Sequence, residues 1–459
     1  MDNARVSAPH ELDPTRRRRR LPTILAVIAV LVVALAGVVT FRPGLLGEIS
    51  PVSAPPEVDG QIVWSSQDRA VQLGPAGWLT HPGEDGGHLA RNVRTGESWV
   101  VGDLAPRMSI AQDGTVVQPV EQEILVQREG ATHTTSTSAI RRAFGDDDLW
   151  PGTNSELVAL SETHVAVITC LAPRPSAVTD DVAGGLLVLA GIRLADGSVD
   201  WTLDTGAGCG PASVTRGKPG TLPAQRYVLL EPREGTAMAV DIDSGTVARR
   251  WPDARPDDIV VQGEHVLAPR GEDTVTWSSL RTGREIAAVE CRGARADDPG
   301  DHSRQLSPAA TPVVTCWESV HALSGDRFVE IPAPPASGGV PLDEGVEVAH
   351  GPLVLRREGP VVHVRDGLTG RSIGGLDVPQ DFEIARFVPK GRLLAFAQWT
   401  SGDRSTASYR VFDTEDGSPV ITTTGGMRTG ASASPEGVVM VTSQEDLSTT
   451  WVALAKGAG

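Results

Sequence analysis

The stretch IRLADGSVDW at residues 192–201 decides the fold, because its pattern recurs along most of the chain. An apolar segment leads to a small or acidic pair, a turn glycine follows, and a second extended segment often carries Trp. The clearest further copies are VDIDSGTVARRW at residues 240–251 and NVRTGESW at residues 92–99. Further copies lie at residues 279–286, 321–329, 364–373 and 411–420, and a weaker copy (LVQREGATH) lies at residues 125–133. Each copy predicts two strands joined by a glycine turn.

The spacing of the copies indicates the architecture. Their turn glycines are Gly96, Gly130, Gly197, Gly245, Gly283, Gly325, Gly370 and Gly417. Apart from one interval of 67 residues, neighbouring glycines are 34 to 48 residues apart, close to the repeat length of propeller blades. Continuous apolar runs between them, such as HVAVITC at residues 164–170, are typical of strands buried on both faces. We therefore predict an all-β fold, a β-propeller of four-stranded blades, with polar Pro/Gly-rich loops at residues 142–152 and 172–185 in the long interval.

The repeated pattern resembles that of quinoprotein-dehydrogenase-like propellers, the family of pyrroloquinoline-quinone-binding-like (PQQ-like) repeats. The resemblance covers about residues 58–459 and lies in the turn glycine and the Trp that follows it. It implies that this Trp packs against the neighbouring blade, a docking role that falls by position to Trp64, Trp99, Trp201 and Trp251. Later copies depart from the family pattern, since about that place is occupied by Ile286, Phe328, Ile373 and Val420.

The number of blades depends on the two ends of the chain. Residues 449–459 (TTWVALAKGAG) resemble the third strand of a blade, and residues 59–65 (DGQIVWS) resemble a fourth. We predict that the ends share one blade, because an open ring would leave exposed strand edges. Eight glycine turns and this shared blade would make nine. Because the Gly130 copy is the weakest and eight blades are usual in the related family, we predict eight, with seven or nine as alternatives.

Residues 21–41 (LPTILAVIAVLVVALAGVVTF) carry no charge, and as a helix they would cross a hydrocarbon core of roughly 30 Å. Five arginines at residues 16–20 place the N-terminus in the cytoplasm by the positive-inside rule. We predict a basic cytoplasmic tail at residues 1–20, a transmembrane signal anchor at 21–41, a Pro-rich linker at 42–57 and an extracytoplasmic propeller at 58–459. The expected location is the cytoplasmic membrane, with the lipid bilayer as the partner of the anchor. A cleaved signal peptide is the alternative, since Ala34-Leu35-Ala36 fits a cleavage site.

Charge is distributed unevenly along the chain. The first 42 residues carry +4 and the remainder carries −21. Because an acidic domain repels phosphate backbones, nucleic acid is not an expected partner. Of 41 basic residues only Lys218, Lys390 and Lys456 are lysines, and this composition resembles that of high-GC bacteria such as actinobacteria.

The four cysteines, Cys170, Cys209, Cys291 and Cys316, lie in the predicted extracytoplasmic domain, where disulfides persist. Four cysteines allow three connectivities. The sequential pairs, 170 with 209 and 291 with 316, close short loops between neighbouring strands and are favoured, with buried free thiols as the alternative. No CxxC motif or nearby His pattern accompanies them, so no metal site is predicted.

The catalytic patterns HExxH and GxxxxGK[ST] are both absent from the sequence. The stretches GAGCG at residues 206–210 and DIDSG at 241–245 are interpreted as turns, and Asp146-Asp147-Asp148 as a solvated loop. The ten scattered His are interpreted as structural. Catalytic quinoprotein dehydrogenases carry an adjacent Cys pair, which this sequence lacks. We therefore predict no catalytic residue and no cofactor, and we identify no cofactor-binding residue.

These observations favour a non-catalytic binding or scaffold module in the cell envelope, with an envelope protein or a cell-wall ligand as its partner. Two alternatives from other classes stay open. One is a quinone-cofactor-dependent oxidoreductase. The other is a ligand-sensing ectodomain, which would need a partner protein because the tail at residues 1–20 is too short for a signalling domain.

Overall fold

The computed structural model describes the protein from residue 61 to residue 454, with gaps. The described residues are 61–66, 71–83, 87–102, 108–146, 148–173, 185–209, 213–214, 226–233, 236–297, 306, 310–335, 343–377, 382–390, 393–400, 403–413, 418–422, 429–433, 438–443 and 450–454. They belong to one compact unit, Pro56–Gly459. The predicted tail, anchor and linker at residues 1–57 lie outside them. Within these ranges, no helix has both the length and the apolar character needed to cross a membrane.

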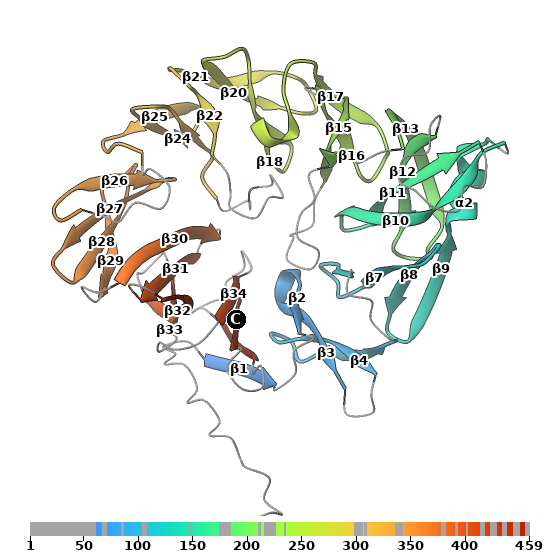
Figure 1. Ribbon diagram of the computed structural model, residues 1–459, viewed down its shortest axis with the longest axis horizontal. Coiled ribbons are helices and arrows are strands. Elements are labelled where there is room, and N and C mark those ends of the chain that lie inside the picture. Colours follow the sequence, from blue (N-terminus) through green and yellow to red (C-terminus); the bar gives the residue numbers. More distant parts are fainter. Residues whose placement is uncertain are drawn as a thin grey trace, which may run out of the picture. The chain divides into compact units, whose positions relative to one another are not determined.

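The domain is a β-propeller, and its described strands form nine four-stranded antiparallel sheets (Figure 1). The first four sheets in chain order are β2 (Gln72–Leu73), β3 (Trp78–Pro82), β4 (His88–Asn92) and β5 (Ser98–Val101); β6 (Ser109–Ile110), β7 (Val116–Val120), β8 (Glu123–Arg128) and β9 (Ala131–Ser136); β10 (Trp150–Leu160), β11 (His164–Ala172), β12 (Leu186–Arg193) and β13 (Val199–Gly208); and β14 (Ser213–Val214), β15 (Tyr227–Arg233), β16 (Thr236–Asp241) and β17 (Val247–Trp251).

The fifth to eighth sheets continue the same order. They are β18 (Val260–Gln262), β19 (His265–Pro269), β20 (Thr274–Ser279) and β21 (Glu285–Glu290); β22 (Arg295–Ala296), β23 (Val313–Thr315), β24 (Val320–Ser324) and β25 (Arg327–Ile331); β26 (Glu347–His350), β27 (Leu353–Glu358), β28 (Val361–Asp366) and β29 (Ser372–Asp377); and β30 (Phe382–Lys390), β31 (Leu393–Thr400), β32 (Asp403–Asp413) and β33 (Pro419–Thr422).

The ninth sheet is built from both ends of the chain. Its order is β34 (Thr429–Ala433), β35 (Val438–Ser443), β36 (Thr450–Leu454) and then β1 (Gln61–Ser66). Strands β1 and β36 pair antiparallel, with Gln61 opposite Leu454 and Ser66 opposite Thr450. Figure 1 shows β1, from the start of the chain, in the same blade as β34, from its end; the two are the outer strands of this sheet. The prediction that the two ends share one blade, with the C-terminal segment as third strand, is confirmed.

The predicted number of eight blades is wrong, because the described strands form nine sheets. The miscounted repeat is the one at Gly130, which connects β8 to β9 and belongs to a complete sheet. This copy matches poorly because its fourth strand carries His133 and Thr135 instead of Trp. Thr135 Oγ1 donates a hydrogen bond to Gly197 O in the turn of the next sheet, and a Cβ on Gly197 would approach His133 Cβ to 2.7 Å. Polar docking therefore replaces an aromatic side chain at this blade.

The continuous apolar runs form the second strand of their sheets, as β11 and β19 show. In β11, Val165, Val167 and Leu171 are fully buried and pack toward the preceding sheet, while Ala166 and Ile168 pack toward the following one. A blade between two others buries both faces, so alternation of polar and apolar residues disappears from its central strands. The core accordingly lies between successive sheets.

The predicted loop at residues 142–152 is partly wrong. Helix α2 (Thr137–Phe144) extends into it, and β10 begins at Trp150. The helix starts where Ser136 Oγ accepts a hydrogen bond from Ala139 N, and it ends at Gly145 with φ of 84°. Its buried Ile140 packs into the apolar core between the second and third sheets, with Ile124 and Val167. The helix is shorter than the periodic stretch that a sequence pattern can reveal. Two 3₁₀ turns also occur. The turn η2 (Pro75–Gly77) precedes β3, a second strand, and the turn η3 (Pro256–Asp258) precedes β18, a first strand. Most of the second predicted loop lies outside the described residues.

Candidate binding surface

The strands of each sheet end along two opposite sides, and these two sides, which we call edges, carry different connections. At one edge, which we call the turn edge, glycine turns such as those at Gly96, Gly197 and Gly245 join the third strand to the fourth. At the opposite edge, the crossover edge, the second strand passes into the third and the chain leaves the fourth strand for the next sheet. The turn edge is uniform, because the described glycines of the repeat have φ between 65° and 81°.

Of the tryptophans that the resemblance assigned to docking, Trp99 and Trp201 lie near the turn edge, whereas Trp251 ends β17 at the crossover edge. Trp201 Nε1 donates to Ile242 O of the next sheet at 2.9 Å, and its indole lies against Gly245. A Cβ on Gly245 would approach Trp201 Cδ2 to 2.5 Å, so the close packing requires glycine there. Trp251 is 6 % exposed and packs with Ile259 and Val266 of the following sheet.

The other two tryptophans make similar contacts around the first sheet. Trp64 in β1 packs against Leu73 and Leu79, and its ring centroid lies 5.0 Å from that of His81. Trp99 in β5 lies 4.4 Å from Trp78, measured between ring centroids. Both indoles reach the turn at Gly114 in the second sheet, and Trp78 Nε1 donates to Gln112 O at 3.1 Å. Each of the four tryptophans thus contacts the sheet that follows its own.

The stretches interpreted as turns have their polar groups engaged locally. Asp241 Oδ1 accepts from the backbone N–H groups of Asp243 and Ser244, and Asp241 Oδ2 accepts from Arg226 Nε at 3.2 Å. This carboxylate therefore closes the turn at Gly245. The interpretation of residues 206–210 as a turn is wrong for residues 206–208, which end β13; Gly206 N donates to Asp204 Oδ1 at 2.8 Å where the pairing of β13 with β12 is irregular. Asp146 Oδ1 accepts from Asp148 N, and Asp147 lies outside the described residues.

Both disulfides lie at the crossover edge and have the predicted pairing. Cys170, in the second strand of the third sheet, is bonded to Cys209, which directly follows the fourth strand, with Cα atoms 5.5 Å apart. Cys291, which follows β21, is bonded to Cys316, which follows β23 of the next sheet, with Cα atoms 6.0 Å apart. The first bridge closes a connection within one sheet, and the second ties two sheets together.

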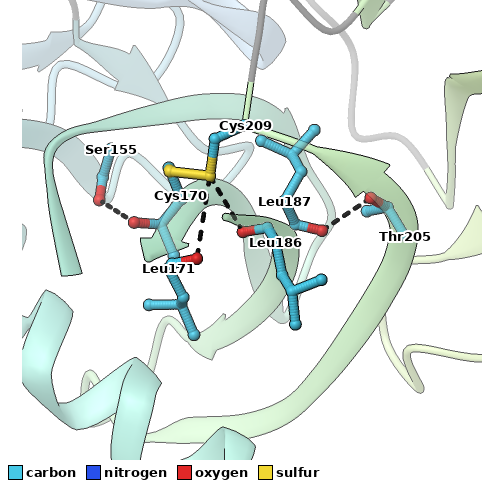
Figure 2. The surroundings of a disulfide bond; sticks show 8 residues. Ser155, Cys170, Leu171, Leu186, Leu187, Thr205 and Cys209 are labelled. Atoms are coloured by element: carbon cyan, nitrogen blue, oxygen red, sulfur yellow. Dashed lines mark hydrogen bonds between the residues drawn. A yellow bond between two sulfur atoms is a disulfide. The ribbon is translucent and has the colours of Figure 1, made fainter. Parts of the chain in front are cut away.

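The surroundings of the first bridge are compact (Figure 2). Cys209 Sγ lies 3.4 Å from Leu186 O and 3.9 Å from Leu171 O. A disulfide sulfur has no hydrogen to donate, so these are packing contacts. Beside the bridge, Thr205 Oγ1 donates to Leu187 O at 2.7 Å, and Ser155 donates to Thr169 Oγ1 at 3.2 Å. The bridge and these hydrogen bonds hold the crossover edge of the third sheet in one conformation.

Exposed apolar side chains gather at the same edge. Among the described residues, the large hydrophobic side chains that solvent reaches most are Val100 at 65 %, Trp317 at 62 %, Trp150 at 49 %, Val346 at 44 % and Val120 at 37 %. Val120 ends a second strand, Trp150 begins a first strand, Trp317 follows a second strand, and Val346 precedes β26. All four positions lie at the crossover edge of their sheets. Val100 lies close to the same edge, one residue before the end of β5 and beside Gly87, which precedes β4.

Each disulfide has one exposed Trp and one Arg beside it. Trp317 follows Cys316, and the guanidinium carbon of Arg292 lies 4.0 Å from its ring centroid. Trp150 pairs with Ala172, two positions beyond Cys170, and the guanidinium of Arg141 lies 5.8 Å from its ring. Aromatic side chains that are partly exposed to solvent on a rigid scaffold are suited to binding, because they lose little conformational entropy when a partner binds. Neither tryptophan was among the residues predicted from the sequence; the proximity of Trp317 to Cys316 was the available signal.

Comparisons with known proteins support the fold of this chain and nothing more specific. No protein-family model matches the sequence, and no curated protein matches it either. Among solved structures, it is similar to BamB from Moraxella catarrhalis, with 10 % identity, a TM-score of 0.37, and coverage of 76 % of this chain and 97 % of that one. It is also similar to the C-terminal WD40 domain of Sif2, with 9 % identity, a TM-score of 0.39, and coverage of 86 % and 99 %. The computationally designed Ika8 protein gives 12 % identity, a TM-score of 0.36, and coverage of 86 % and 100 %.

Proposed function

We propose that the protein is a membrane-tethered, non-catalytic binding module whose propeller lies outside the cytoplasm and whose crossover edge takes an envelope protein or a cell-wall ligand. The observation that carries this proposal is the gathering of Trp150, Trp317, Val120 and Val346 at the edge that bears both disulfides. Tryptophan and arginine are the side chains most enriched among residues that dominate binding energy.

The envelope location rests on two independent features. The uncharged run at residues 21–41 follows a block of five arginines, the arrangement of a single-pass anchor with a cytoplasmic N-terminus. Structural disulfides persist outside the cytoplasm and are rare inside it, and all four cysteines are paired. The Arg-rich composition favours a high-GC bacterial source, and the packing of Trp201 on Gly245 supports membership of the PQQ-like repeat family without its catalytic residues.

Topology is tested with reporters fused after Gly459 in the full chain. A reporter that is active only outside the cytoplasm should work there, and replacing the arginines at residues 16–20 with neutral residues should reduce its activity. Activity of a cytoplasm-only reporter at the same position would overturn the proposed orientation.

Binding is tested by proximity labelling of the full-length protein in its own membranes. Trp150→Ala and Trp317→Ala should each weaken labelling of a specific partner, roughly 5- to 30-fold if either is a dominant contact. Arg281→Ala is the control, because the Arg281 side chain is 70 % exposed but lies in the glycine turn at Gly283, on the turn edge. An unchanged set of labelled molecules in both Trp variants would rule out the crossover edge as the binding surface.

A further inference from the structure

The described part of the chain contains one cluster of side chains with metal-ligand geometry, and it lies at the second disulfide. One ligand atom each from Cys291, Cys316 and His321 lie within 4.8 Å of one another. His321 comes from β24, Cys316 from the end of β23, and Cys291 from the crossover that leaves β21. Two sulfurs and one imidazole are a ligand set that zinc takes readily. In the oxidised protein the two sulfurs are bonded to each other, and only His321 could coordinate.

We infer that the Cys291–Cys316 bridge is the oxidised form of a zinc site, which two thiolates and His321 complete when a dithiol reduces the bridge. A thiolate of the dithiol attacks Cys291 Sγ, in the less buried of the two cysteines, and releases the Cys316 thiolate. The second thiol of the reductant then displaces Cys291 and leaves as a disulfide. Zinc binding to the two thiols releases two protons, and water takes the fourth position.

The three ligands keep their places without the sulfur–sulfur bond. Cys291 N donates to Asp273 O at 2.9 Å, and Ala294 N donates to Cys291 O at 3.2 Å. Cys316 N donates to Ser319 O at 2.8 Å, which closes the turn between β23 and β24. None of these hydrogen bonds passes through a sulfur, so reduction leaves the backbone frame in place.

The distances fit the metal. Two thiolates on a tetrahedral zinc lie about 3.8 Å apart, given Zn–S bonds of about 2.3 Å. Breaking the bridge lets the sulfurs separate to that distance by side-chain rotation, while the Cα atoms stay 6.0 Å apart. His321 Nε2 lies 3.0 Å from Ser319 Oγ. When Nε2–H donates to that hydroxyl, Nδ1 holds the lone pair that a zinc ligand requires.

The first disulfide is an internal control. Cys170 and Cys209 are also bonded at a crossover edge, but no described His, Asp or Glu forms a ligand cluster with them. Reduction of that bridge therefore yields two thiols without a third ligand. The proposal concerns one bridge of two and predicts that they respond differently to zinc.

The test uses the full-length protein in detergent, treated with a dithiol and then with zinc alone. Competition with a chromogenic chelator should find one tightly bound zinc per reduced chain and none per oxidised chain. Co²⁺ in place of zinc should show thiolate charge-transfer absorption. The variant with Cys170→Ser and Cys209→Ser should keep this site, and the variant with Cys291→Ser and Cys316→Ser should lose it. Ser319→Ala should weaken zinc binding about 10- to 100-fold, and His321→Ala should weaken it more.

Two results would overturn the proposal. One is a reduced protein that keeps its far-ultraviolet circular dichroism yet binds no zinc. The other is equal zinc affinity in wild type and His321→Ala. If reduction unfolds the chain, a second measurement decides. In a dithiol redox buffer, zinc should raise the reduced fraction of the 291–316 pair in wild type and not in His321→Ala, and an unchanged fraction in wild type contradicts the site.

Discussion

The interface between the third and fourth sheets and that between the fifth and sixth join neighbouring blades in different ways. In the first, Trp201 lies on Gly245, and its indole N–H donates to Ile242 O. In the second, Ile286 and Phe328 pack against a shared apolar cluster, and a Cβ on the corresponding turn glycine, Gly325, would meet nothing within 4 Å. A disulfide from Cys291 to Cys316 crosses this second interface.

The difference shows two means of fixing one blade on the next. An indole on a glycine turn combines a large apolar contact with a directed hydrogen bond, and so it sets both distance and orientation. Aliphatic side chains bury area but do not fix orientation. At the fifth and sixth sheets a covalent bridge supplies that constraint. The predictions below test this comparison, starting with the change that removes a tryptophan-bearing interface completely.

Deleting residues 449–459 should have the largest effect. The deletion removes β36, the neighbour of β1 in the composite sheet, and with it the support of Trp64 on the first sheet. About four ladder hydrogen bonds at roughly 1 kcal/mol each would be lost, together with fully buried Val452. That loss approaches the total stability of a typical domain, about 5–15 kcal/mol.

Thermal unfolding of the full chain measures the deletion. The truncated protein should be largely unfolded at the temperature where wild type is stable. Trp64→Ala should act on the same sheet from the other end of the chain, so the two changes should be non-additive. A truncated protein that melts within a degree or two of wild type would show that closure by the chain ends contributes nothing.

Trp201→Ala should destabilise by about 3 kcal/mol, the lower end of the range for tryptophan, since this side chain is half-buried. Trp201→Phe keeps most of the ring but loses the hydrogen bond to Ile242 O, which is worth about 1 kcal/mol. Ile286→Val, in the other interface, should cost about 1 kcal/mol or less. Chemical denaturation separates the three. Equal losses for Trp201→Ala and Ile286→Val would remove the distinction between the two interfaces.

Gly245→Ala and Gly283→Ala form a matched pair of smaller changes. The two glycines occupy equivalent turns with φ of 69° and 70°. At Gly283 a Cβ would meet nothing within 4 Å, so alanine should cost only the strain of a left-handed backbone, about 1–2 kcal/mol. At Gly245 the Cβ would also strike Trp201, which should add about 1–3 kcal/mol.

A double variant tests whether Trp201 is the reason that the two alanine substitutions differ in cost. Trp201→Ala removes the obstacle, so in that background Gly245→Ala should cost no more than Gly283→Ala. Denaturant midpoints of the two single and two double variants give the comparison. If Gly245→Ala stays more costly without the indole, the tryptophan is not the reason that glycine stands there.

The parts of the fold that repeat or lie next to one another in the chain could be predicted from the sequence. The glycine turns, the second strands and both disulfide pairs follow from local patterns, and the shared blade follows from an incomplete repeat at each end of the chain. The blade count failed at Gly130 because His133 and Thr135 perform the docking there, and neither resembles Trp in sequence. Helix α2 was missed because eight residues show too little periodicity.

The candidate surface and the candidate zinc site could not be predicted in this way. Trp150 and Trp317 are far apart in sequence, and only the strand directions place both at crossover edges. His321 lies five positions after Cys316 and thirty after Cys291, a spacing unlike that of zinc motifs. A turn between β23 and β24 and a crossover between sheets bring the three together. Such sites depend on which edges meet, and sequence periodicity does not contain that information.

The smallest expected effect is the pH dependence of the polar half of the Trp201 interface. Asp243, in the glycine turn of the fourth sheet, accepts hydrogen bonds from Ser161 Oγ at 2.6 Å and Thr163 Oγ1 at 2.7 Å in the third sheet. Burial alone would raise the pKa of Asp243, but these hydrogen bonds and nearby His164 together hold that pKa below its usual value. A carboxyl with a lowered pKa stabilises the fold above its unfolded-state pKa, about 3.9, and loses that contribution as the pH falls through the folded-state pKa.

The difference in melting temperature between wild type and Asp243→Asn should therefore be present at pH 6 and shrink as the pH falls below about 4. Ser161→Ala keeps the carboxyl and removes one donor, so it should lose part of the same dependence. The effect is small because the Asp243 side chain is 47 % exposed and solvent screens its charge. A wild-type advantage that persists unchanged to pH 3 would mean that the ionised carboxylate of Asp243 does not stabilise the contact between these sheets.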